Sequence, residues 1–70
     1  MLKIVIRERR MERYMTQKDL AARLISKVGT PLHQAELSRY ENGKVEPPLD
    51  IILQIAEVLN CKVEELVSRQ

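Results

Sequence analysis

Apolar residues recur along this chain at the three- and four-residue spacing of amphipathic helices. The pattern predicts five helices: one from residue 4 or 6 to 14, one over residues 17–26, one from between 31 and 34 to 41 or 42, one over 48–59 and one over 63–67. The first start stays open, because Ile4-Val5-Ile6 is β-branched and also suits an extended backbone. We therefore expect residues 1–70 to form one compact, all-α domain of five helices.

The apolar faces of the middle three helices predict the core. Small Ala21 would let another helix approach closely, and the absence of Phe and Trp makes the core aliphatic apart from tyrosine. In the fourth helix the apolar stripe is broad and also takes in Leu49 and Leu53. The residues expected to be buried are Leu20, Ala21, Leu24, Leu37, Tyr40, Ile52, Ile55, Ala56 and Leu59.

Specific residues mark the helix ends. Thr16 is a good N-cap, and Asp19 stands where the acid of a capping box belongs. Gly43 stops the third helix, because glycine adopts the left-handed conformation without a Cβ penalty. Pro48 is tolerated at the start of the fourth helix, and Asn60 can close it.

The charge is unevenly distributed along the chain. The formal net charge is +2, but residues 1–44 hold ten Lys/Arg and five Asp/Glu, whereas residues 45–70 hold two Lys/Arg and five Asp/Glu. A basic front on a nearly neutral protein suits contact with phosphate groups. The alternative is that these side chains only solvate the fold.

Several classes of protein are disfavoured by the composition. No segment approaches the roughly 18 apolar residues of a membrane span, and residues 1–6 are too few for the core of a signal peptide, so we expect a cytoplasmic protein. The single cysteine, Cys61, excludes an internal disulfide and is expected to be a small, partly buried hydrophobe. Without metal-ligand spacing, a nucleophile–base set or a Gly-rich phosphate loop, no metal, cofactor or enzymatic activity is expected.

Three motifs follow one another along the chain: Thr-Gln-x-x-Leu-Ala from residue 16, Leu-Ser-Arg-Tyr-Glu-Asn-Gly-Lys from residue 37, and Pro-x-Leu-x-x-x-Leu-x-Ile-Ala-x-x-Leu from residue 47. Together they resemble the lambda-repressor/Cro (XRE-type) helix-turn-helix family over about residues 6–67. The connection over residues 25–33 departs from the tight turn of common bacterial members and is similar to that of the POU-specific domain. The resemblance implies that the second helix crosses the DNA backbone while the third lies in the major groove.

Gln34 is the first candidate for contact with a base. Its amide can bond adenine N6 and N7 together. In the resembling family a glutamine at this place reads bases, braced by the glutamine that opens the second helix, which here is Gln17. A phosphate contact also suits Gln17, because helix N-termini attract anions. For both residues, the alternative is simple polarity at an exposed helix start.

Four further residues of the third helix are candidates with open alternatives. Arg39 can reach guanine O6/N7 or a phosphate, or can instead pair with Glu36 at i−3. Glu36 repels phosphate unless it accepts from cytosine N4, so it either specifies a base or is solvated. Ala35 can contact a thymine methyl group or merely allow close approach, and Ser38 touches the DNA backbone or nothing.

The remaining candidates flank these helices. Lys44 follows the third helix and should reach a phosphate, and Thr16 can donate to a phosphate, although its cap alone explains it. Arg10 and Glu41 match a pair that the resembling family often buries between the first helix and the end of the third, which implies a structural ion pair. His33 is expected to be a residue of the helix start and no catalyst.

The leading functional hypothesis is a sequence-specific regulator that binds double-stranded DNA, as a prokaryotic or phage repressor or autoregulator. One recognition helix covers few base pairs, so we expect a symmetric homodimer on a palindromic operator. Its contact surface is expected on the last two helices, where Cys61, Val63 and Val67 lie. The alternative is a protein-interaction module, such as an antitoxin with a toxin as its partner, that keeps the helix-turn-helix fold.

Overall fold

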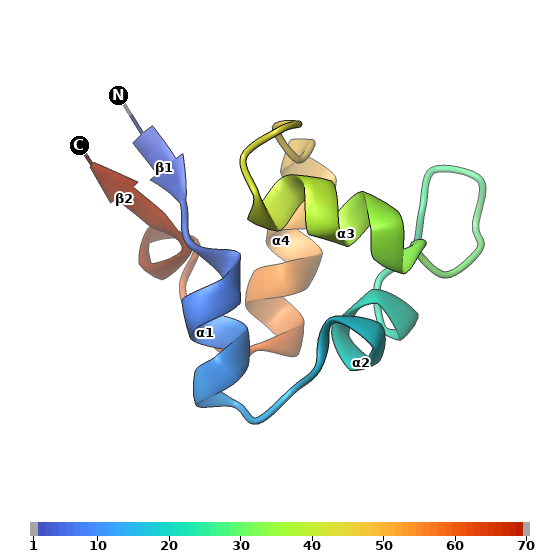
Figure 1. Ribbon diagram of the computed structural model, residues 1–70, viewed down its shortest axis with the longest axis horizontal. Coiled ribbons are helices and arrows are strands. Elements are labelled where there is room, and N and C mark those ends of the chain that lie inside the picture. The colour runs from blue at the N-terminus through green and yellow to red at the C-terminus, as the bar shows by residue number, and fades with distance from the viewer. Residues whose placement is uncertain (1, 70) are drawn as a thin grey trace.

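The computed structural model describes the backbone of residues 2–69 and the side chains of residues 4–67 (Figure 1). Helical segments dominate this part of the chain, and a short strand lies at each end. The elements, in order, are β1 (Leu2–Ile4), α1 (Ile6–Glu12), α2 (Gln17–Ala22), α3 (Gln34–Glu41), α4 (Leu49–Val58), the 3-10 helix η1 (Val63–Leu66) and β2 (Val67–Arg69).

The all-α class is confirmed by four α-helices and η1, which is a single 3-10 turn at the place of the fifth predicted helix. β1 and β2 form a two-stranded antiparallel pair in which Ile4 is opposite Val67. This pairing explains both ends of the helical region. α1 begins at Ile6, as in the second of the two expected starts, and the last helical turn stops at Leu66 because the next residue joins the strand.

The second helix is shorter than predicted. α2 ends at Ala22, so its expected extension to Ser26 is wrong. The Gln54 side chain of α4 makes hydrogen bonds with both backbone groups of Ile25. Its Oε1 accepts from the Ile25 amide at 2.8 Å, and its Nε2 donates to the Ile25 carbonyl oxygen at 3.1 Å. These groups are the ones that a longer helix would need.

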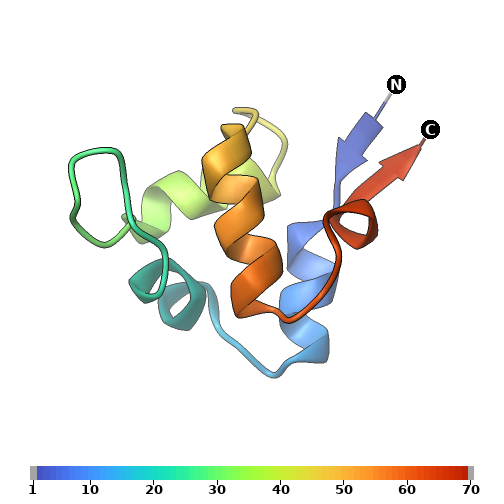
Figure 2. The same ribbon diagram turned by 180° about the vertical axis from the view of Figure 1, so that it is seen from behind.

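Residues 25–31 form a small hairpin, which we call the α2–α3 hairpin. The Ser26 amide donates to the carbonyl oxygen of Thr30 at 2.8 Å, and the two hydroxyl groups lie 3.1 Å apart. Gly29 makes the turn with φ +84°, a conformation that glycine adopts at little cost. The hairpin projects from one end of the molecule, and the β1–β2 pair lies at the other (Figures 1 and 2).

The core lies among the helices and is aliphatic except for Tyr40. Its buried apolar residues are Ile6, Leu20, Ala21, Leu24, Leu32, Leu37, Tyr40, Ile51, Ile55, Ala56, Leu59 and Leu66. In α4 the predicted Ile55, Ala56 and Leu59 are buried, and Ile51 is buried in place of Ile52. Ile51, Ile55 and Leu59 form the buried line at i, i+4 and i+8, so Ile52 is only half-buried. Leu49 and Leu53 of the apolar stripe are 67% and 50% exposed.

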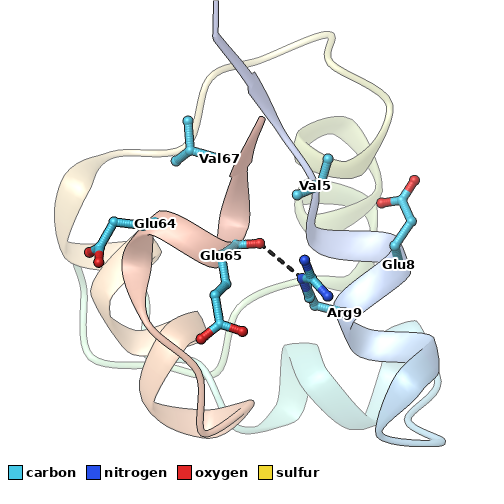
Figure 3. Close-up of a pocket in the computed structure, with 6 residues that line it drawn as sticks. All are labelled: Val5, Glu8, Arg9, Glu64, Glu65 and Val67. Atoms are coloured by element: carbon cyan, nitrogen blue, oxygen red, sulfur yellow. Dashed lines mark hydrogen bonds between the residues drawn. The ribbon is translucent and has the colours of Figure 1, made fainter. Parts of the chain in front are cut away.

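Arginine side chains of the N-terminal segment hold the C-terminal part of the chain. Arg9 Nε donates to the carbonyl oxygen of Glu65 at 2.9 Å, across a hollow between α1 and η1 (Figure 3). Arg13 Nε donates to the carbonyl oxygen of Leu59 at 2.8 Å, at the end of α4. Asn60 closes that helix with φ +52°, which confirms its predicted role as a helix stop.

Candidate nucleic-acid interface

The start of α2 is fixed by a capping box. The Asp19 amide donates to Thr16 Oγ1 at 3.0 Å, and the Thr16 amide donates to Asp19 Oδ2 at 3.2 Å. Thr16 lowers the pKa of the Asp19 carboxyl, first through the hydrogen bond from its backbone amide and then through its side chain. The expected cap is therefore present, and it places Gln17 as the first residue of α2.

The outer face of α3 carries the predicted base-contacting residues. Leu37 and Tyr40 bury the inner face, and burial raises the pKa of the Tyr40 hydroxyl. On the other side Gln34, Ala35 and Arg39 are exposed. α2 packs against α3 (Figure 1). The first residues of the two helices, Gln17 and Gln34, are hydrogen-bonded to each other, so both helix starts contribute to one surface. We call this surface, made of Thr16, Gln17, Gln34, Ala35, Ser38, Arg39 and Lys44, the α2–α3 face.

A chain of hydrogen bonds joins the predicted base reader to a buried ion pair. Gln34 Nε2 donates to Gln17 Oε1 at 3.4 Å, and Gln17 Nε2 donates to Glu41 Oε1 at 3.1 Å. Glu41 in turn accepts from Arg10, at Oε2 from Nε over 2.8 Å and at Oε1 from Nη2 over 3.0 Å. The two glutamines therefore lie side by side, as the resemblance implied, and the link from Gln17 to Glu41 was not expected.

The Arg10–Glu41 pair connects α1 to the end of α3. Its side chains are only 10% and 1% exposed, and the two parallel hydrogen bonds make it bidentate. Arg10 Nη1 also donates to the carbonyl oxygen of Met15 at 2.8 Å. The hydrogen bonds to Glu41 raise the pKa of the Arg10 guanidinium against the opposing effect of burial. Both charges are thus compensated in a site with little water.

Arg39 and Glu36 adopt the alternative that the sequence left open. Arg39 Nη1 lies 3.8 Å from Glu36 Oε1, with the side chains 56% and 38% exposed, so this pair is loose and water competes for it. Glu36 lines a hollow together with Lys27 of the α2–α3 hairpin and Pro48 at the start of α4. Its carboxylate therefore belongs to the flank of α3, whereas Arg39 remains free to leave the pair for another partner.

The end of α3 places Lys44 beside the same surface. Ser38 Oγ accepts from Asn42 Nδ2 at 3.3 Å. Gly43 has φ +74°, which confirms the predicted helix stop. The Lys44 amide then donates to the carbonyl oxygen of Arg39 at 3.0 Å, so the chain folds back over the last turn. The exposed Lys44 side chain thus follows directly on the outer face of α3.

Two features around this surface were not expected from the sequence. The segment of the α2–α3 hairpin was expected only as part of a longer connection, although Ser26, Gly29 and Thr30 are typical turn residues. The bond from Gln17 to Glu41 joins residues 24 apart and forms only when α2 and α3 are packed together.

Two other features, a membrane-spanning helix and a metal-binding group, are not seen in the described part of the chain. No helix of residues 2–69 is long and apolar enough to cross a membrane, and the described side chains contain no group of three or more His, Cys, Asp or Glu suited to a metal.

Comparison with known proteins agrees with this geometry. No curated protein matches the chain. Among solved structures, the chain is similar to Bacillus thuringiensis PlcR, which was crystallised in complex with the peptide PapR7 and DNA. The sequence identity is 34% and the TM-score is 0.71. The match covers 87% of this chain but only 19% of the PlcR chain, so this protein corresponds to a small part of PlcR. The helix-turn-helix family matches residues 6–66, and the chain therefore belongs to the XRE-type helix-turn-helix family.

Proposed function

We propose that this protein is a regulator that recognises a specific sequence in double-stranded DNA through the α2–α3 face. The observation that carries the proposal is the contact between Gln34 and Gln17, which places two amides at the starts of α3 and α2. In this arrangement α3 lies in the major groove and α2 crosses the backbone. PlcR, to which this chain is 34% identical over the matched region, is in complex with DNA in its crystal structure, which supports DNA as the partner.

Each residue of the surface has a role in this proposal. Gln34 reads adenine through N6 and N7, and Arg39 leaves Glu36 to bond guanine or a phosphate. Gln17 and Lys44 hold phosphates at the two sides of α3. The positive charge of Lys44 makes binding depend on salt.

Thr16, Ala35 and Ser38 complete the proposed contact. Thr16 has its hydroxyl engaged as the cap of α2, so it contributes mainly by fixing the helix start that faces a phosphate. Ala35 lets α3 approach the bases closely, and the Ser38 hydroxyl faces the DNA backbone. The negative charge of Glu36 on the flank of α3 keeps phosphates away from that side.

Selection of bound duplexes from random DNA tests the proposal, followed by binding of variants across a salt series. Gln34→Ala and Arg39→Ala should each relax specificity at individual base pairs, by about 1–3 kcal/mol for a good contact. Lys44→Ala should instead weaken all duplexes about equally and lower the salt slope by roughly one unit. If Gln34→Ala and Arg39→Ala each bind every duplex with the same affinity as the parent chain, α3 does not read DNA.

The finer proposal is a prokaryotic or phage repressor or autoregulator that acts in the cytoplasm, as a homodimer on a palindromic operator. Two copies would place the half-sites roughly 34 Å apart, one turn of DNA. Of the residues expected at the dimer contact, Cys61 and Val63 are half-buried against the core. The exposed pair Leu49 and Leu53 offers more apolar surface. Sedimentation of the parent chain and of Leu53→Lys on a full operator tests this, and a monomer bound to one half-site at saturating DNA would contradict it.

The same exposed leucines favour one second candidate, a protein-interaction module such as an antitoxin. They lie one turn apart on α4, outside the α2–α3 face, so a protein partner could be held while DNA is bound. This candidate would be supported if a toxin encoded by a neighbouring gene co-purifies with the protein in the absence of DNA and no longer does so with Leu53→Lys.

A further inference from the structure

The buried ion pair imposes a direction on the hydrogen bonds that lead to Gln34. A guanidinium group can only donate, and an ionised carboxylate can only accept. Arg10 occupies Glu41 through both carboxylate oxygens, at 2.8 and 3.0 Å, in a site where Glu41 is 1% exposed. Because both Glu41 oxygens accept hydrogen bonds from Arg10, a further neighbour of Glu41 must also present a donor.

That neighbour is Gln17, whose amide can present either end. With Nε2 toward Glu41 Oε1 the bond of 3.1 Å forms, whereas the reversed amide would place two acceptor oxygens against each other. The Oε1 atom of Gln17 is therefore left for Gln34. Since Gln17 Oε1 is an acceptor, Gln34 must donate to it from Nε2, which lies 3.4 Å away. The orientation of both amides thus follows from the ion pair, without reference to a base.

A fixed amide orientation has a consequence for base recognition. When one N–H of Gln34 is engaged by Gln17, the amide keeps its oxygen and its second N–H along one edge. On this edge the amide oxygen accepts from adenine N6 and the N–H donates to N7, so the edge fits adenine in only one orientation along the groove. An A·T pair and a T·A pair present these groups at different places in the major groove.

We propose that Glu41 is a positioning residue for base recognition, which acts through Gln17 to fix the amide of Gln34 and so selects A·T over T·A at one base pair. The inference rests on the proposed function, since it requires that Gln34 contacts a base. It gives Glu41, which is too buried to touch DNA, a role in specificity in addition to its role in the fold.

Two variants test this role. In Glu41→Gln the new amide can donate as well as accept, so both orientations of Gln17 become possible. In Gln17→Met the chain of bonds is cut while the Arg10–Glu41 pair stays intact, which protects the fold. Glu12→Gln is the matched control, because it makes the same change in an exposed ion pair with Arg9, at 3.1 Å on α1.

The measurement is the affinity for the selected duplex divided by the affinity for the duplex with that one base pair reversed. A good contact should give the parent chain a ratio on the order of 10–100. Glu41→Gln and Gln17→Met should bring the ratio close to unity and leave the preferences at other base pairs in place. Glu12→Gln should keep the parent ratio. Side-chain amide signals of Gln34 in NMR spectra of the free protein should shift in the first two variants only.

The outcomes separate the two proposals. A parental ratio in Gln17→Met, with the fold checked by circular dichroism, overturns the positioning role, whether or not Glu41→Gln folds. A loss of affinity for all duplexes alike, with the ratio kept, would likewise show that Glu41 is only structural. If Gln34→Ala itself keeps the parental ratio, the proposed base contact fails instead.

Discussion

Removal of one partner of the buried ion pair should destabilise the protein strongly. In Arg10→Met the Glu41 carboxylate, 1% exposed, keeps only the hydrogen bond from Gln17. Breaking a buried pair in this way costs about 3–5 kcal/mol, since an uncompensated charge remains. A chain of 70 residues has a total stability on the order of 4–10 kcal/mol, so this loss is a large share of it. With a urea m-value near 1 kcal/mol/M, the unfolding midpoint should fall by about 3 M or more.

The assay is urea unfolding followed by circular dichroism, with the double variant Arg10→Met/Glu41→Leu as the decisive comparison. Two apolar residues in place of the pair remove both charges, so most of the lost stability should return. Glu36→Gln is the control for an exposed pair and should change the free energy of unfolding by about 1 kcal/mol or less. A double variant as unstable as Arg10→Met would refute the reasoning, because the loss would then come from packing and not from the unpaired charge.

Three further predictions concern stability and reactivity. Leu37→Ala should cost about 2–5 kcal/mol in urea unfolding, because Leu37 is fully buried in the core. Thr16→Ala should cost about 0.5–2 kcal/mol through the lost cap. The pKa of Asp19 is lowered in the folded chain, so its stabilising effect is complete above the unfolded value of about 3.9 and is lost as the pH falls through the folded value. The stability difference between the parent and Thr16→Ala should therefore shrink in acid unfolding experiments. Burial raises the pKa of the Cys61 thiol, so iodoacetamide should alkylate it more slowly at pH 8 than a cysteine in the urea-unfolded chain, as measured by mass spectrometry.

The sequence predicted well those elements whose signals are local. The cap at Thr16, the stop at Gly43 and the buried Leu37–Tyr40 face all follow from side chains within one turn of each other. The length of α2 could not be predicted in the same way. It ends early because Gln54, 29 residues away from Ile25, satisfies the backbone of that residue. The face of α4 was ambiguous for a related reason, since several apolar residues compete for the core and only packing selects Ile51 over Leu53.

In the candidate site, too, some features follow from the sequence and others only from packing. The positions of Gln17 and Gln34 at two helix starts follow from the motifs. The pairing of Arg10 with Glu41 was expected from the family resemblance. The connection between these two pairs does not, because no sequence pattern shows that the carboxylate end of Glu41 also reaches the amide of Gln17. It depends on α1, α2 and α3 meeting at one point, with distances of 2.8–3.1 Å that packing sets.

A buried ion pair needs a reason beyond stability, because apolar residues of similar size are often as stable in the same place. Arg10 and Glu41 hold α1 against α3, but a methionine and a leucine could do so as well. What the apolar pair lacks is an acceptor for Gln17. If the charges serve only the fold, Arg10→Met/Glu41→Leu should retain the base preference of the parent along with its stability. If Glu41 orients Gln17 and Gln34, the double variant should be stable and bind DNA, yet no longer distinguish A·T from T·A at one base pair. Stability and base specificity would then separate in a single protein.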